Sequence, residues 1–200
     1  MEIIDVKKIF SQMTEVIGEN KTYLQDLDTA IGDGDHGFNM NRGMQKANED
    51  IQAMEFDDLK QLFSKVAMDF ISTIGGASGP LYGTFFMRFA PVFAGKTEIT
   101  REDFNKAFQM GVEGIKQRGQ AQVGDKTMID VLEPVSEALN AGKSLEEVEA
   151  IARDKKEATK DYKANKGRAY YLGERSIGHI DPGAASSYFL IKSFCEYRGE

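Results

Sequence analysis

Apolar residues recur along the chain at the spacing of amphipathic helices. They step by three or four positions from Val6 to Ile17, and the same spacing returns in 59–74 and 104–115. This spacing places one apolar stripe on one face of each helix. Strand-like alternation is almost absent, so the sequence predicts an all-α protein. The expected helices span residues 3–19, 20–28, 37–55, 58–74, 79–94, 100–118, 127–141, 144–163 and 183–198, with the first two separate or joined in one bent unit.

The connections between these helices alternate in kind. The short and polar connections lie near residues 56–57, 95–99 and 142–143. The connections that hold clusters of glycine lie near residues 29–36, 75–78, 119–126 and 164–182. Every second connection of an up-and-down bundle lies at the same end. We therefore expect the four glycine-rich connections to meet at one end of the bundle.

Each glycine-rich connection leads into the start of a helix. Pro80 and Pro182 stand where a proline in the first helical turn is tolerated. The free N–H groups and the dipole of a helix N-terminus attract anions. Several such ends around flexible backbone would suit a ligand that carries phosphate. The alternative is that these glycines only cap helices and permit close packing.

The segment LDTAIGDGDHGFNM, residues 27–40, places Asp28, Asp33 and Asp35 among three glycines. Clustered carboxylates repel one another unless a cation lies between them. Oxygen-only ligands, with coordination positions left for phosphate oxygens, favour Mg²⁺ over Ca²⁺. A calcium-binding EF-hand is excluded, because Met44 stands where its bidentate glutamate belongs. The alternative is a loop of three solvated acids.

Two further segments resemble phosphate-binding motifs without fulfilling them. GDGDHG, residues 32–37, has the glycine spacing of a dinucleotide fingerprint, but no buried strand precedes it and its two aspartates would repel a pyrophosphate. GQAQVGDKT, residues 119–127, nearly matches a Walker A loop but carries Asp125 between glycine and lysine. Both indicate backbone compatible with phosphate and neither predicts a Rossmann or P-loop fold.

A few side chains beside the glycine clusters are candidates for ligand contact. His36 adjoins the three acids and is suited to contact a phosphate or orient a ligand, whereas His179 is a weaker candidate. Arg168 and Arg175 flank the last cluster and could balance phosphate charge. Met128, at a helix start beside a glycine loop, could line an adenine pocket. Surface or core roles are the alternatives for all of these residues.

Composition narrows the class of protein. The 200 residues suit one domain, 1–200, and 25 basic against 32 acidic residues give a net charge of −7 without a basic stripe, which argues against nucleic-acid binding. No apolar run approaches the roughly 18 residues of a membrane span, and no export signal is evident. A single cysteine, Cys195, cannot form an internal disulfide, so we expect a cytoplasmic protein.

Four segments together resemble the nucleotide-binding domain family of dihydroxyacetone kinases. They occur in the order of that family and span residues 27–187: LDTAIGDGDHGFNMNRG, GGASGPLYGTFF, VGDKTMIDVLEP and GRAYYLGERSIGHIDPGAASS. The resemblance implies a closed up-and-down barrel of about eight amphipathic helices with a nucleotide at one end. A free-standing chain of this length is most similar to the ADP-binding subunits of the phosphotransferase-system-dependent kinases.

The resemblance also implies roles for particular residues. Asp28, Asp33 and Asp35 would hold Mg²⁺ ions that bridge the nucleotide phosphates. The residues implied to contact the nucleotide are His36, Gly37, Phe38, Asn39, Ala77, Ser78, Gly119, Met128, Arg168, Asp181, Pro182 and Gly183.

The implied reaction uses ADP as a retained cofactor. A phosphohistidine on a multiphosphoryl partner would convert the bound ADP to ATP, and the γ-phosphate would pass to dihydroxyacetone held by a second, sugar-binding subunit. No residue of this chain would then need to act as the base toward the sugar. The alternatives are a kinase domain that exchanges free ATP and a non-catalytic, ADP-bound protein that binds a transcription regulator.

Overall fold

The computed structural model describes residues 1–197, and in that range it is helical. The α-helices are α1 (Ile3–Ile31), α2 (His36–Ala53), α3 (Leu59–Thr73), α4 (Ser78–Phe89), α5 (Arg101–Gly119), α6 (Ile129–Asn140), α7 (Leu145–Ala158) and α8 (Pro182–Glu196). Short 3-10 helices follow α4 and α7 and precede α8: η1 (Ala90–Phe93), η2 (Thr159–Asp161) and η3 (Arg168–Ser176). Residues 1–197 contain no β-strand, only one isolated bridge between Glu2 and Glu98. The all-α prediction is confirmed.

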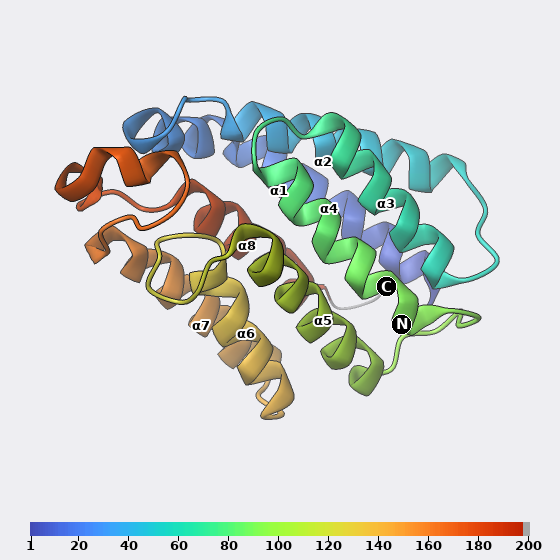
Figure 1. Cartoon of the computed structure of the whole chain (residues 1–200). Coiled ribbons are helices and arrows are strands. Elements are labelled where there is room, and N and C mark those ends of the chain that lie inside the picture. The colour runs from blue at the N-terminus through green and yellow to red at the C-terminus, as the bar shows by residue number, and fades with distance from the viewer. Residues whose placement is uncertain (198–200) are drawn as a thin grey trace.

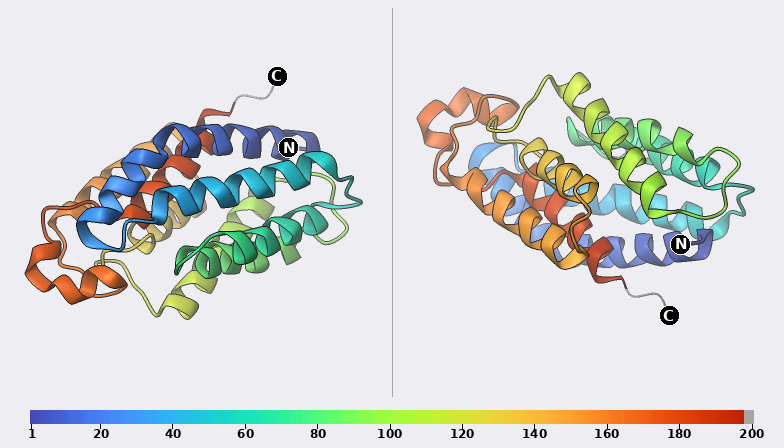
Figure 2. Two further views of the ribbon diagram at one scale, coloured as in Figure 1. Left: turned by 90° about the horizontal axis from the view of Figure 1, so that it is seen from above. Right: turned by 90° about the horizontal axis from the view of Figure 1, so that it is seen from below.

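The eight α-helices form a closed ring. Each helix packs against the next one along the chain, and α8 returns to pack against α1 (Figures 1 and 2). The hydroxyl of Tyr197, just beyond α8, donates to Asp5 Oδ1 near the start of α1 at 2.9 Å. The inward apolar stripes merge into one core, whose largest fully buried apolar side chains include Phe70, Phe93, Ile17, Leu24, Met40 and Leu62. In the described part of the chain, no helix has both the length and the apolarity to cross a bilayer.

Several helix boundaries differ from those predicted. Residues 3–31 form one helix, the joined alternative that the sequence left open, and it ends three residues later than expected, with Leu24 and Ile31 buried in its second half. The helix expected at 79–94 changes to 3-10 geometry at Ala90, next to Pro91, which cannot donate a backbone hydrogen bond. The helix expected from residue 127 begins at Ile129, after Lys126 with a φ of 62°.

The connection expected at 164–182 contains structure that the sequence did not predict. Residues Arg168–Ser176 form η3, which Gly173 interrupts with a φ of 57°. The two tyrosines of η3, Tyr170 and Tyr171, are exposed and lie edge to face. Polar and glycine-rich sequence gives little signal for such a short helix, because its i to i+3 bonds need no apolar stripe.

The polar connections lie together at the end of the ring away from the glycine clusters. The N–H of Leu59 donates to Lys96 O at 2.8 Å, and the N–H of Gly95 donates to Asp58 Oδ2 at 2.7 Å. Asp58 also caps α3 by accepting from the N–H of Gln61. These bonds tie the α2–α3 connection to the segment before α5.

Candidate nucleotide and metal site

The four glycine-rich connections converge on one cleft, as the alternation of loops predicted. The cleft encloses about 160 Å³ at the ends of α1, α2, α4, α6 and α8. Residues from all four connections line it, among them Gly32, Asp33, Gly75, Gly76, Lys126, Gly167, Arg168 and Asp181. An up-and-down ring therefore brings together segments that are 140 residues apart in the sequence.

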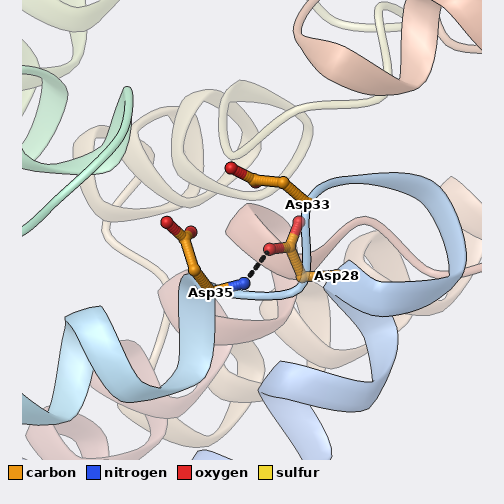
Figure 3. Close-up of side chains that lie close together, drawn as sticks. All are labelled: Asp28, Asp33 and Asp35. Carbon is orange, nitrogen blue, oxygen red and sulfur yellow. Dashed lines mark hydrogen bonds between the residues drawn. The ribbon is translucent and has the colours of Figure 1, made fainter.

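Asp28, Asp33 and Asp35 form the acidic side of this cleft. Each offers a carboxylate oxygen, and the three oxygens lie within 4.8 Å of one another (Figure 3). Asp28 is buried near the end of α1, and its Oδ2 accepts hydrogen bonds from the N–H groups of Asp35 at 2.8 Å and His36 at 3.1 Å. This carboxylate thus holds the start of α2 against the end of α1.

Gly32 shows that the loop is built tightly around the Asp28 carboxylate. A Cβ atom at residue 32 would collide with Asp28 Oδ1, the oxygen that the backbone N–H groups leave available. Only glycine leaves that oxygen accessible from the loop side. Three carboxylates with no sulfur or nitrogen ligand among them suit a hard divalent cation that keeps several water or phosphate ligands. The donor set therefore fits Mg²⁺.

Arg168 faces the acids from the opposite side of the cleft. Its Nη2 lies 2.8 Å from Asp33 Oδ2, and the arginine side chain is 66% exposed. The first residue of η3 thereby reaches the loop between α1 and α2. A guanidinium at this position neutralises part of the acidic charge and suits a phosphate group as a second partner.

His36, at the start of α2, is buried between two hydroxyl groups. Its Nδ1 lies 3.1 Å from Ser78 Oγ on α4, and its Nε2 lies 2.9 Å from Ser186 Oγ on α8. Burial lowers the pKa of His36 from its ordinary value, although the charges of Asp28 and Asp35 raise it, so burial favours the neutral imidazole. Both ring nitrogens already have protein partners.

The loop before α6 is organised by buried charges. Asp130 accepts from the N–H of Gly124 at 2.5 Å and from the N–H of Thr127 at 2.6 Å, and burial raises its pKa. The ammonium of Lys126 donates to the carbonyls of Thr159 and His179, two segments of the α7–α8 connection. Lys126 therefore fastens the third glycine-rich connection to the fourth.

Asp181 caps α8 at the floor of the cleft. Its Oδ2 accepts from the N–H of Ala184 at 2.7 Å, and Pro182 follows it in the first turn. Burial raises the pKa of Asp181 to about 7, with further contributions from the charges of Asp130 and Asp28. The bond from Ala184 and the charge of Lys126 act in the opposite direction.

Three helices begin beside the cleft. Residues of the first turns of α2, α4 and α8 are part of its lining: His36, Ser78, Pro182 and Gly183. The first N–H groups of a helix have no acceptor within that helix and carry the positive end of its dipole. The cleft thus combines acids for a cation with helix ends for an anion, which is the combination that a metal-bound phosphate requires.

The residues predicted for nucleotide contact divide into two groups. Those that line the cleft are His36, Ala77, Ser78, Met128, Arg168, Asp181, Pro182 and Gly183. Within residues 1–197, the lining does not include Gly37, Phe38, Asn39, Gly119, His179 or Arg175.

The residues outside the lining have other contacts. Gly37 lies against α1, where a Cβ atom would collide with Lys21 O, and Phe38 is 53% exposed. Asn39 accepts from Arg42 at 2.8 Å. Gly119 faces Leu81 at the end of α5. His179 offers its carbonyl to Lys126.

Sequence reasoning missed several residues of the site. Lys126, Thr127, Lys166 and Gly167 line the cleft, and Ser186 and Tyr82 lie behind His36. The near-match to a Walker A loop contains Lys126 and Thr127, so that motif was the available signal for both. Ser186 and Tyr82 carry no local signal, because a serine or tyrosine on a buried helix face resembles ordinary core.

Comparison with known proteins places this cleft in a family. Residues 30–196 match the family described as the DAK2 domain. The chain belongs to the DAK2 domain family. The match runs from the acidic loop to the end of α8 and so includes every connection that lines the cleft.

Two relatives that align with this chain over about nine-tenths of their length are named as kinase subunits. The chain is 48% identical over 182 residues to the protein named PEP-dependent dihydroxyacetone kinase 1, ADP-binding subunit DhaL, of Listeria innocua, covering 91% of this chain and 90% of that one. It is 42% identical to the ADP-binding subunit DhaL of the PEP-dependent dihydroxyacetone kinase of Escherichia coli, with 89% of each chain covered.

A solved structure of a larger kinase has the same fold. The dihydroxyacetone kinase from C. freundii, in complex with AMP-PNP and Mg²⁺, superposes with a TM-score of 0.76 and 26% identity over 96% of this DAK2 chain. The chain spans about a third of that kinase, since the match covers 33% of its length.

Proposed function

We propose that this DAK2 chain is the ADP-binding subunit of a phosphotransferase-dependent dihydroxyacetone kinase. The observation that carries the proposal is the cleft itself, in which three carboxylates face three helix N-termini. Relatives of nearly equal length are named as ADP-binding subunits, and the C. freundii kinase of the same fold was solved with a nucleotide and Mg²⁺.

In this proposal Asp28, Asp33 and Asp35 hold Mg²⁺, which when bound neutralises charge on the transferring phosphoryl group. The N-termini of α2, α4 and α8 receive phosphate oxygens through main-chain N–H groups. Arg168, whose guanidinium pairs with Asp33, would be placed to bind a phosphate as well. Met128 and the Asp181–Pro182–Gly183 turn border the remainder of the nucleotide.

The proposed reaction requires two partner proteins. A subunit that carries phosphohistidine donates its phosphoryl group to the bound ADP, which becomes ATP. A second subunit holds dihydroxyacetone. The names of the relatives, PEP-dependent or PTS-dependent, support this route over a kinase that uses free ATP. The cleft residues of this chain then position and neutralise the nucleotide phosphates, and the chemistry on the sugar belongs to the other subunit.

Two measurements test the proposal. The protein purified without added nucleotide is denatured, and the released nucleotides are separated on a column; we expect about one equivalent of ADP. The chain is then mixed with the phosphorylated donor, the sugar-binding subunit and dihydroxyacetone without free ATP, and we expect sustained turnover. A strict need for free ATP would favour an exchanging kinase domain, and bound ADP without any turnover would favour a regulatory protein.

A further inference from the structure

A chain of hydroxyl groups lies behind the nucleotide cleft. Ser186 Oγ, on α8, lies 2.9 Å from His36 Nε2 and 2.9 Å from the hydroxyl of Tyr82. It also lies 3.1 Å from the carbonyl of Gly183, to which it donates. The Tyr82 hydroxyl lies 2.8 Å from Ser187 Oγ, and burial raises the pKa of Tyr82 to about 12, so the hydroxyl keeps its proton.

The direction of these hydrogen bonds follows from counting protons. A serine hydroxyl has one proton to donate and two lone pairs that accept. The carbonyl of Gly183 can only accept, so the Ser186 proton lies toward it. Ser186 Oγ must then accept from both His36 Nε2 and Tyr82, and Tyr82 in turn accepts from Ser187.

The opposite arrangement leaves a repulsive contact. If Ser186 donated to a bare Nε2, its oxygen would face the Gly183 carbonyl without a proton between them. A buried pair of acceptors without a proton is costly. The structure therefore favours a proton on Nε2 and a bare Nδ1.

An unprotonated Nδ1 fixes the direction of the hydrogen bond with Ser78. Its hydroxyl, 3.1 Å away at the start of α4, must donate its only proton to Nδ1. The Ser78 oxygen then presents lone pairs to the cleft, and any phosphate at this helix end is left to the main-chain N–H groups. His36, the first residue of α2, at the same time contacts the first residue of α4, Ser78, and the second turn of α8 at Ser186.

We propose that Ser186 is a positioning residue for the nucleotide site: it holds His36 as the Nε2–H tautomer, and His36 in turn fixes the Ser78 hydroxyl and the three helix starts. This inference rests on the proposed nucleotide site for its effect on affinity. The tautomer itself is independent of any ligand and is measured on the protein without nucleotide.

The direct test is nitrogen-15 NMR of the imidazole rings. The chain has only two histidines, so the His36→Gln variant assigns the signals and His179 serves as the internal reference. We expect His36 to show a protonated Nε2 and an unprotonated Nδ1. The reverse tautomer, or equal amounts of both, would overturn the proposal whether or not the protein binds ADP.

The second test compares two buried serines of α8 by calorimetric titration with Mg²⁺ and ADP. Ser186→Ala should weaken ADP binding about tenfold and shift the His36 Nε2 resonance. Ser193→Ala is the matched control, since its hydroxyl is buried without a hydrogen-bond partner among residues 1–197, and we expect no change. Equal affinities for Ser186→Ala and wild type would contradict the proposal.

A double-mutant cycle separates action through His36 from independent contacts. Ser78 and Ser186 touch opposite nitrogens of one ring. If both act through that ring, the double alanine variant should lose little more ADP affinity than the weaker-binding single variant. Strictly additive losses would show that each hydroxyl acts alone. If wild type fails to bind ADP, the proposed function falls and the NMR measurement still decides the tautomer.

Discussion

Arg168 Nη2 donates to Asp33 Oδ2 across 2.8 Å and so connects the last glycine-rich segment of the chain to the first. The guanidinium forms an ion pair with a carboxylate that would also be a ligand of the cation. We therefore expect metal binding to release Arg168 from Asp33, and the freed guanidinium would then be available to a phosphate.

Replacing Arg168 by alanine should have opposite effects on metal and nucleotide. Without ADP, the affinity for Mg²⁺ or Mn²⁺ should rise about two- to fivefold, because an exposed competing ion pair is lost. Affinity for ADP in the presence of Mg²⁺ should fall. Calorimetric titrations measure both. Arg153→Ala is the control, since Arg153 pairs with Glu149 and does not line the cleft; parallel changes in both affinities would contradict the coupling.

Asp33→Asn should weaken binding of Mg²⁺–ADP by about tenfold or more, because an amide is a poorer ligand for a hard cation than a carboxylate. Binding of ADP in EDTA should change much less. Asp154→Asn, at a side chain that is 76% exposed, controls for the loss of one negative charge. Unchanged affinity for Mg²⁺–ADP in Asp33→Asn would remove this residue from the metal site.

The raised pKa of Asp181 predicts that the free energy of unfolding depends on pH. The pKa of Asp181 is raised from 3.8 to about 7 in the folded protein. Between pH 3.8 and 7, Asp181 therefore keeps its proton in the folded state and has lost it in the unfolded state. Stability from this group is then lost as pH rises through that range. Asp181→Asn keeps an N-cap side chain, and we expect the variant to gain stability over wild type at pH 8 and little at pH 4. Urea denaturation at pH 8 and pH 4 measures the free energy of unfolding of both proteins. An equal difference between variant and wild type at the two pH values would contradict the prediction.

Two glycines predicted to contact nucleotide should differ in their structural roles. Gly37→Ala should destabilise the protein by about 2–4 kcal/mol, because the new Cβ meets the backbone of Lys21 and Gln25 on α1. Gly119→Ala should be neutral or stabilise by up to ~1 kcal/mol, since its Cβ would lie 3.4 Å from Leu81 Cδ2 within a helix. Thermal unfolding ranks the two variants, and an ADP titration of Gly119→Ala shows whether that residue borders the base.

The sequence predicted the location of the cleft because the topology of a bundle constrains it. Once the glycine clusters alternate with polar connections, an up-and-down chain brings all four clusters to one end. The acids were equally accessible to sequence reasoning, since Asp28, Asp33 and Asp35 lie within eight residues of one another.

The parts that could not be predicted depend on contacts across the ring. His36 and Ser186 are 150 residues apart, and no local pattern relates them. Lys126 belongs to a near-match of a Walker A loop, and nothing in that motif indicates that its ammonium binds two backbone carbonyls more than thirty residues further along the chain. The helix α6 begins later than predicted because of the same loop, in which Asp130 accepts a hydrogen bond from the N–H of Thr127.

Because α8 packs against α1, the cleft depends on the order of the helices around the ring rather than on which helix comes first in the chain. Tyr197 lies on Asp5, and the Ala141–Ser144 connection is a short turn between α6 and α7. A circular permutation that links Tyr197 to the start of α1 and opens this turn would keep every neighbouring helix pair and leave the cleft residues in place. The site is thus a property of the closed ring of helices.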